Sequence, residues 1–134
     1  MAVFHLTVAT PDGSLYNGEA EALYLRGTEG DLGILPNHMN FAAAIGMGHA
    51  KVVTSEGTKN AACIGGLVVV RDNEVSVAAT TWEWAENIDL SRAERAEEKA
   101  RKILEKSNIS DSDLKYAEAK LKRALVRKSV GTLR

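Results

Sequence analysis

The amino-acid sequence predicts an N-terminal antiparallel β-sandwich followed by a C-terminal antiparallel hairpin of two helices. Ten of the 11 glycines and both prolines lie before residue 67, and neither residue type occurs in residues 85–130. Charge divides at the same place: residues 1–84 carry four basic and nine acidic side chains, whereas residues 85–134 carry 13 basic and nine acidic ones. Apolar residues alternate in the first part and recur at three- and four-residue spacing in the second, which are the periods of strand and helix. We therefore expect two domains, residues 1–84 and residues 85–134.

The first domain shows the pattern of short antiparallel strands. Phe4, Leu6 and Val8 alternate with less apolar residues, which is typical of a strand with one buried face. Residues 11–13 (PDG) follow as a turn, since proline presets φ and glycine tolerates positive φ. Apolar runs on both sides of residues 71–74 (RDNE) predict a β-hairpin. Such strands, with no helical pattern between them, favour a sandwich or barrel, and the domain has room for roughly seven or more of them.

The second domain shows two helical patterns separated by a short break. Asp89 stands where a helix N-cap belongs. The first apolar stripe consists of Leu90, Ala93, Ala96, Ala100, Ile103 and Leu104. After the break, Ser110 and Asp113 have the spacing of a capping box. The second stripe consists of Leu114, Ala117, Leu121, Ala124 and Leu125. Because the break is short, the two helices are expected to lie antiparallel.

The hairpin is expected to be marginally stable. Its facing stripes are rich in alanine, which buries little apolar surface, and isolated helices of this length are borderline in water. We therefore predict that a surface, a ligand or a partner fixes its shape, and that it has two accessible conformations. Trp82 and Trp84 flank the change from strand to helix and are expected to seat the hairpin on the sheet.

Composition excludes several classes of protein. Hydrophobic residues at 45% and charged residues at 26% are typical of a globular chain, and the net charge of −1 argues against general nucleic-acid binding. A single cysteine, Cys63, excludes an internal disulfide framework and is expected to be a small core residue. The chain shows neither a signal-peptide pattern nor an apolar run of transmembrane length. The residues therefore predict a soluble, cytoplasmic protein.

Motifs for catalysis are absent from the sequence. It contains no phosphate-binding GxxxxGK[ST] loop and no HExxH or GxSxG string, and its three histidines are scattered. His38 lies in a glycine- and proline-containing loop, where a hydrogen bond that fixes the loop is its expected role. We therefore expect no catalytic residue and no metal site, and an independent enzyme is the least favoured interpretation.

The second helix is strongly basic, and cations on both helices share faces. Arg123 and Arg127 are four residues apart, and Arg92 and Lys99 on the first helix are seven apart, so each pair lies on one face. Antiparallel pairing of the helices could bring these four cations together, an arrangement that suits a polyphosphate. A solvated helix face and a helix that docks on an acidic partner are the alternative interpretations of the basic residues.

Four segments together resemble the epsilon subunit of bacterial F-type ATP synthase, over essentially the whole chain. They are residues 10–13 (TPDG), residues 30–38 (GDLGILPNH), residues 65–77 (GGLVVVRDNEVSV) and residues 88–93 (IDLSRA). The combination of residues 30–38 with residues 88–93 is highly specific to this family. One difference is Asn40, which stands where the family usually has proline.

The resemblance implies a ten-stranded β-sandwich and a two-helix domain in a non-catalytic subunit of the central rotor stalk. The sandwich would bind the gamma subunit and the c-ring and help couple proton flow to rotation, at the cytoplasmic face of the bacterial cell membrane. The helices would either fold into a hairpin or extend along gamma into the alpha–beta hexamer and inhibit ATP hydrolysis. The residues implied to meet an acidic segment of the beta subunit are Lys122, Arg123, Arg127 and Lys128.

In some members of the family ATP binds the folded hairpin. The residues that match this nucleotide site are Glu83, Ile88, Asp89, Arg92, Lys99, Arg123 and Arg127, together with Ala93. The two carboxylates would accept hydrogen bonds from the adenine or ribose, and the cations would bind phosphates. Lys99 replaces a family arginine and so lacks the bidentate fork. No prosthetic group is implied, and whether Mg accompanies ATP is left open.

Two functions of other classes are alternatives to the stalk subunit. A free-standing ATP-binding sensor would bind the nucleotide without any rotary partner. An RNA-binding protein could use the basic second helix, but the acidic first domain and the lack of exposed aromatic strings disfavour it.

Overall fold

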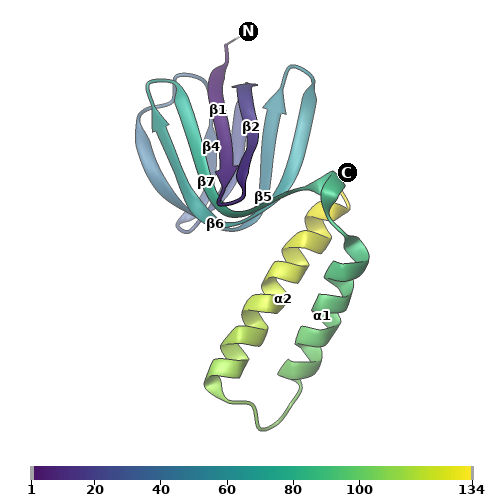
Figure 1. The fold of residues 1–134 in the computed structure, drawn as a ribbon. Helices are drawn as coiled ribbons and strands as arrows, with labels where there is room; N and C mark the ends of the chain where they lie inside the picture. The colour runs from purple at the N-terminus through teal and green to yellow at the C-terminus, as the bar shows by residue number, and fades with distance from the viewer. Residues whose placement is uncertain (1, 134) are drawn as a thin grey trace.

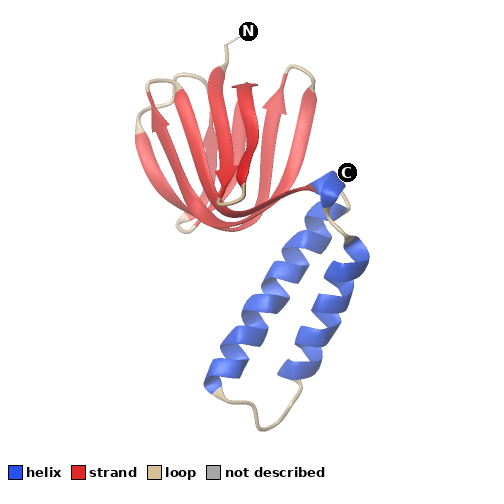
Figure 2. Ribbon diagram, viewed as in Figure 1, coloured by secondary structure: helices blue, strands red, loops and turns tan. Residues whose placement is uncertain are grey.

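The computed structural model describes residues 2–133 and consists of a curved seven-stranded sheet from which a two-helix hairpin projects (Figure 1). The elements are β1 (Phe4–Thr10), β2 (Gly13–Ala20), β3 (Ala22–Gly27), β4 (Gly30–Ile34), β5 (Phe41–Thr54), β6 (Gly57–Arg71), β7 (Glu74–Trp84), a 3-10 turn (Ala85–Asn87), α1 (Leu90–Leu104) and α2 (Asp111–Gly131). Figure 2 shows that the chain changes from strand to helix once, after β7. The end residues of the two predicted domains, Met1 and Arg134, lie outside the described residues.

The sheet has the order β2-β1-β7-β6-β5-β3-β4, and every neighbouring pair is antiparallel except β1 and β7. It curls so that its inner face encloses one core, which includes the fully buried Phe4, Leu6 and Leu23. The sandwich followed by a helical hairpin is confirmed. The ten strands that the family resemblance implied are wrong for this chain: β5 and β6 run through the bend of the sheet as single strands of 14 and 15 residues.

Two adjacent glycines in the middle of β6 change which side chains face the core. Gly65 and Gly66 have φ values of +77° and +140°, a region that disfavours residues with a Cβ. Before them Ala61 and Cys63 belong to the sandwich core. After them the core residues of β6 are Val68 and Val70. The inward-facing positions therefore change from odd to even numbers at the glycine pair.

The neighbouring strand β7 changes phase at the same level. Its core residues are Val77 and Ala79 on one side of the change and Trp82 and Trp84 on the other. Glu83, between the two tryptophans, therefore faces outward toward the hairpin. The expectation that the tryptophans seat the hairpin is wrong, because the phase change turns both into the sandwich core.

Cys63 is a free cysteine within that core, as expected. Its side chain is buried, and burial raises the pKa of its thiol to about 12. The thiol therefore stays protonated at neutral pH and acts as a small apolar core group.

Both helices begin at the predicted caps. The Asp89 carboxylate accepts a hydrogen bond from the Arg92 backbone N–H at 3.0 Å, and the Ser110 hydroxyl accepts one from the Asp113 N–H at 3.2 Å. Each cap satisfies a backbone donor that has no partner within its helix. The sequence signals for the two helix starts are confirmed.

Small residues line the contact between the helices and between the hairpin and the sandwich. The buried helix residues are Ala93, Ala100, Ala117, Ala124, Val130 and Gly131. The hairpin seats through a cluster made by Ala62 of β6 with Ala85, Ile88 and Val130, against which Leu90 packs. These contacts are made mostly by small side chains, and the marginal stability of the hairpin stays a prediction. No helix among residues 2–133 is long and apolar enough to cross a membrane.

The loop between β4 and β5 is tied to the turn between β6 and β7. The Asn40 side-chain carbonyl accepts a hydrogen bond from the Asp72 backbone N–H at 2.8 Å, and the Asn73 side chain accepts one from the Asn37 N–H at 2.7 Å. His38 contacts the Met39 carbonyl at 2.9 Å, in the loop-fixing role expected of it. Proline at position 40 could not accept the hydrogen bond from Asp72, so Asn40 stabilises the loop by a side-chain bond that the usual family residue cannot make.

Candidate nucleotide-binding site

A cavity of about 410 Å³ lies where the end of β7 meets the two helices. Its lining residues are Glu83, Asn87, Ile88, Asp89, Arg92, Ala93, Ala96, Lys120, Arg123, Ala124 and Arg127. Six of the seven residues proposed from the sequence to bind nucleotide are among them, and Lys99 is not. The volume falls in the range of small-molecule sites.

The charged lining residues come from three parts of the fold. Glu83 faces the cavity because of the phase change in β7, and Asp89 is fixed as the cap of α1. Arg92 follows within the first turn of that helix. Arg123 and Arg127 lie one turn apart on α2, on the face that lines the cavity. The fold therefore brings carboxylates and guanidinium groups from three elements around one space.

Two of these residues already bind each other. The Arg127 Nε lies 2.6 Å from the Glu83 Oε1, and both side chains are about one-third exposed, at 32% each. A charge-assisted hydrogen bond at this distance is strong and tethers α2 to the last strand of the sandwich. The charge of Arg127 is therefore largely neutralised in this conformation.

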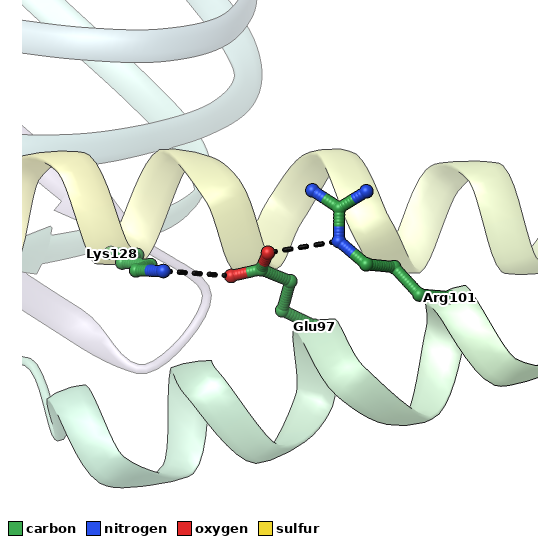
Figure 3. Close-up of polar contacts among 3 residues, drawn as sticks. All are labelled: Glu97, Arg101 and Lys128. Atoms are coloured by element: carbon green, nitrogen blue, oxygen red, sulfur yellow. Dashed lines mark hydrogen bonds and ion pairs between the residues drawn. The ribbon is translucent and has the colours of Figure 1, made fainter.

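A second ion pair joins the two helices. Glu97 of α1 accepts hydrogen bonds from Arg101 Nε at 2.9 Å and from Lys128 Nζ of α2 at 3.2 Å (Figure 3). The bonds from Arg101 and Lys128 lower the pKa of the Glu97 carboxyl. Of the four residues proposed to meet an acidic partner, Arg127 and Lys128 are thus paired inside the chain. Lys122 and Arg123 are exposed and make no ion pair with another described residue.

Replacing Glu97 by glutamine is expected to loosen the hairpin at neutral pH. Because the pKa of Glu97 is lowered in the folded hairpin, its stabilisation is present above the ordinary glutamate pKa of about 4.3 and is lost as the pH falls through the lowered value. Hydrogen exchange of the α2 backbone amides should therefore be faster in Glu97→Gln than in the parent at pH 7, and the difference should disappear in acid. Glu98→Gln is the matched control, since Glu98 pairs only with Lys102 of its own helix at 3.3 Å. Equal exchange in the two variants would contradict the role of the Glu97–Lys128 contact.

Sequence reasoning missed two polar residues of the cavity, Asn87 and Lys120. Asn87 ends the 3-10 turn, which no sequence pattern indicated. Lys120 lies three residues before Arg123 and seven before Arg127, so its helical spacing places all three on one face. That spacing was the signal that could have found it.

The cavity combines cationic and acidic side chains around one space. Within residues 2–133 no three His, Cys, Asp or Glu side chains are grouped as a metal site. Cations are concentrated on the α2 side, and the carboxylates of Glu83 and Asp89 lie toward the sandwich. Such a distribution suits a ligand with a polyanionic end and a hydrogen-bonding end.

Comparison with known families covers nearly the whole chain. Residues 3–85 match the family model for the ATP synthase delta/epsilon chain β-sandwich domain, and residues 86–130 match that for the ATP synthase delta/epsilon chain long α-helix domain. The chain therefore belongs to the ATP synthase delta/epsilon chain family.

Curated relatives agree with this assignment. The chain is 38% identical over 132 residues to the ATP synthase epsilon chain of Ligilactobacillus salivarius, an alignment that covers 96% of this chain and 95% of the relative. It is 39% identical over 131 residues to the epsilon chain of Ruminococcus albus, with 97% of each chain covered.

Solved structures share the fold. A chain of the mitochondrial ATP synthase of Euglena gracilis, in a structure of OSCP/F1/c-ring, matches with a TM-score of 0.84 at 22% identity, over all of this chain and 83% of the other. A chain of the Tetrahymena thermophila mitochondrial ATP synthase central stalk/c-ring matches with a TM-score of 0.62 at 16% identity, over 95% of each chain. At these identities the likeness establishes the fold.

Proposed function

We propose that this chain is the epsilon subunit of a proton-translocating F-type ATP synthase, a non-catalytic subunit of the central stalk. Family membership over both parts of the chain supports this, as does the fold shared with chains of two ATP synthase assemblies. In this proposal the sandwich binds the gamma subunit and the c-ring and couples proton flow to rotation. The subunit is then peripheral to the membrane, at its cytoplasmic face in a bacterium.

The helices regulate the motor in this proposal. They fold as the hairpin described above, or they extend along gamma into the alpha–beta hexamer and oppose ATP hydrolysis. The small, alanine-rich contacts of the hairpin support an equilibrium of this kind. In the extended form Lys122, Arg123, Arg127 and Lys128 meet an acidic segment of the beta subunit. Glu83 and Glu97 hold two of these cations in the folded form, so the internal and external acidic groups compete.

ATP binding to the folded hairpin is the second part of the proposal. The observation that carries it is that Glu83, Asp89, Arg92, Arg123 and Arg127, from three elements, line one common cavity. Because extension of the helices would separate these residues, ATP bound among them favours the folded form. At a concentration of one hundred times its dissociation constant, ATP would stabilise that form by about 2.7 kcal/mol. Reversing a 1:99 population needs about 5.5 kcal/mol, so we expect a partial bias rather than a complete switch.

Calorimetry with the isolated full-length chain tests the nucleotide site. The double variant Asp89→Asn, Arg92→Ala keeps a side-chain acceptor at the α1 cap and removes one negative and one positive charge from the cavity lining. We expect ATP affinity to fall by roughly tenfold to a hundredfold, since a hydrogen bond from a charged group contributes about 1.5–3 kcal/mol and Asp89→Asn retains an acceptor, so the Arg92 contact is the main loss. Arg95→Ala is the control, because Arg95 is exposed on α1 and does not line the cavity. Unchanged binding in the double variant would show that the site is elsewhere.

The alternative of a free-standing ATP sensor is distinguished by purification. A stalk subunit should co-purify with a multisubunit ATPase from its native membranes, whereas a sensor should elute as a monomer that still binds ATP. Co-purification without nucleotide binding would retain the stalk function and remove the ATP site from the proposal.

A further inference from the structure

The proposed nucleotide cavity has chemically different ends. Glu83 and Asp89 lie at the end next to the sandwich. The helix α2 runs from the hairpin tip toward the sandwich, so Lys120 lies farther from the sandwich than Arg127 (Figure 1). Seven residues of helix correspond to about 10 Å along its axis. The cavity therefore extends from an acidic end to a basic end along the hairpin.

The cations of the cavity differ in whether their charge is already paired. Arg127 is bonded to Glu83 at 2.6 Å, at the acidic end. Arg92, Lys120 and Arg123 line the cavity without an ion pair to another described residue. An incoming phosphate group can therefore bind these three without breaking an existing pair, whereas binding Arg127 means competing with Glu83.

Lys120 is held in place by an aromatic side chain of its own helix. Its ammonium lies 4.7 Å from the centre of the Tyr116 ring, four residues earlier, within the range of a cation–π contact. A hydrogen bond with Lys120 and its charge lower the pKa of the Tyr116 phenol, and the charges of Arg123 and Lys99 add to this effect. Positive charge from both helices thus gathers at this end of the cavity, beside the 58% exposed Tyr116 ring.

We propose that Lys120 is a phosphate-binding residue and that the phosphates of the nucleotide lie at the Lys120–Arg123 end of the cavity. The base and ribose then lie toward Glu83 and Asp89, whose carboxylates accept hydrogen bonds. Lys120, at the far end of the basic side, contacts the terminal phosphates and so discriminates ATP from AMP. This inference rests on the proposed nucleotide site, with the orientation that the family resemblance implies, and adds to it a residue that selects for phosphate number.

The test compares ATP and AMP binding to the full-length chain by calorimetry, with AMP measured by competition where its affinity is low. Lys120→Gln should weaken ATP binding about tenfold, as expected for one charge-assisted contact, and leave AMP within about twofold. Lys120→Arg should retain most of the ATP affinity, because it keeps the charge. Lys115→Gln, an exposed lysine of α2 outside the cavity, should bind both nucleotides like the parent.

The outcomes separate this inference from the proposed function. Equal losses for ATP and AMP in Lys120→Gln, or no loss for ATP, would overturn the phosphate-binding role while leaving the nucleotide site intact. Failure of the parent chain to bind ATP would instead overturn the nucleotide site and this inference with it. Circular dichroism of Lys120→Gln should match that of the parent, since the replaced side chain is exposed.

Discussion

Gly66→Ala is expected to destabilise the sandwich by roughly 2–5 kcal/mol, a large share of the stability of a domain of this size. Gly66 has a φ of +140°, which costs a residue with a Cβ about 1–2 kcal/mol. A Cβ at this position would also overlap the backbone carbonyl oxygen of Ala78 and lie 2.8 Å from the Cα of Ala79. Relief of such overlap requires β6 and β7 to separate, at a typical cost of 1–3 kcal/mol. Urea unfolding of both proteins measures the difference.

Gly57→Ala is the matched control for this effect. Gly57 also has a positive φ, of +128°, but a Cβ there would meet no atom within 4 Å. Its replacement should therefore cost only the conformational part, about 1–2 kcal/mol. Equal losses in the two variants would show that the close approach of β7 to Gly66 contributes nothing. A Gly66 variant that still folds should also bind ATP more weakly, because the same glycine pair turns Glu83 toward the cavity.

Truncation after Trp84 is expected to raise the ATP hydrolysis rate of the full complex severalfold. The truncation leaves all seven strands in place, because β7 ends at Trp84, and it removes both helices. If the helices oppose rotation in the hydrolysis direction, the complex without them loses that resistance. Steady-state hydrolysis by the two complexes, at matched concentrations and equal subunit content, measures the effect.

The control for the truncation is assembly itself. The shortened chain should still co-purify with the complex and should still support proton-driven ATP synthesis, since the sandwich carries the proposed contacts to gamma and the c-ring. Equal hydrolysis rates in a fully assembled truncated complex would contradict inhibition by the helices and leave only the coupling role. Loss of assembly would contradict the assignment of stalk binding to the sandwich.

Several features of the site followed from short-range patterns. Asp89 and Ser110 were predicted as helix caps because a cap binds a backbone N–H only a few residues away. Arg123 and Arg127 were predicted on one face because the helical period alone sets their relation. Lys99 shares a helix face with Arg92 by the same rule, yet it does not line the cavity. Periodicity places residues on a face but does not limit how far along the helix a cavity extends.

The sequence by itself determined the two-part architecture, the helix boundaries and the concentration of positive charge on the second helix. These depend on glycine and proline content, on periodicity and on contacts within about four residues. Only the tertiary structure decided that Glu83 faces the hairpin and forms an ion pair with Arg127, and that Glu97 forms an ion pair with Lys128. The partners in each pair are 44 and 31 residues apart, so their meeting depends on the phase change at Gly65 and Gly66 and on the rotation of α2 against α1. Such long-range geometry has no signature in the local order of the residues.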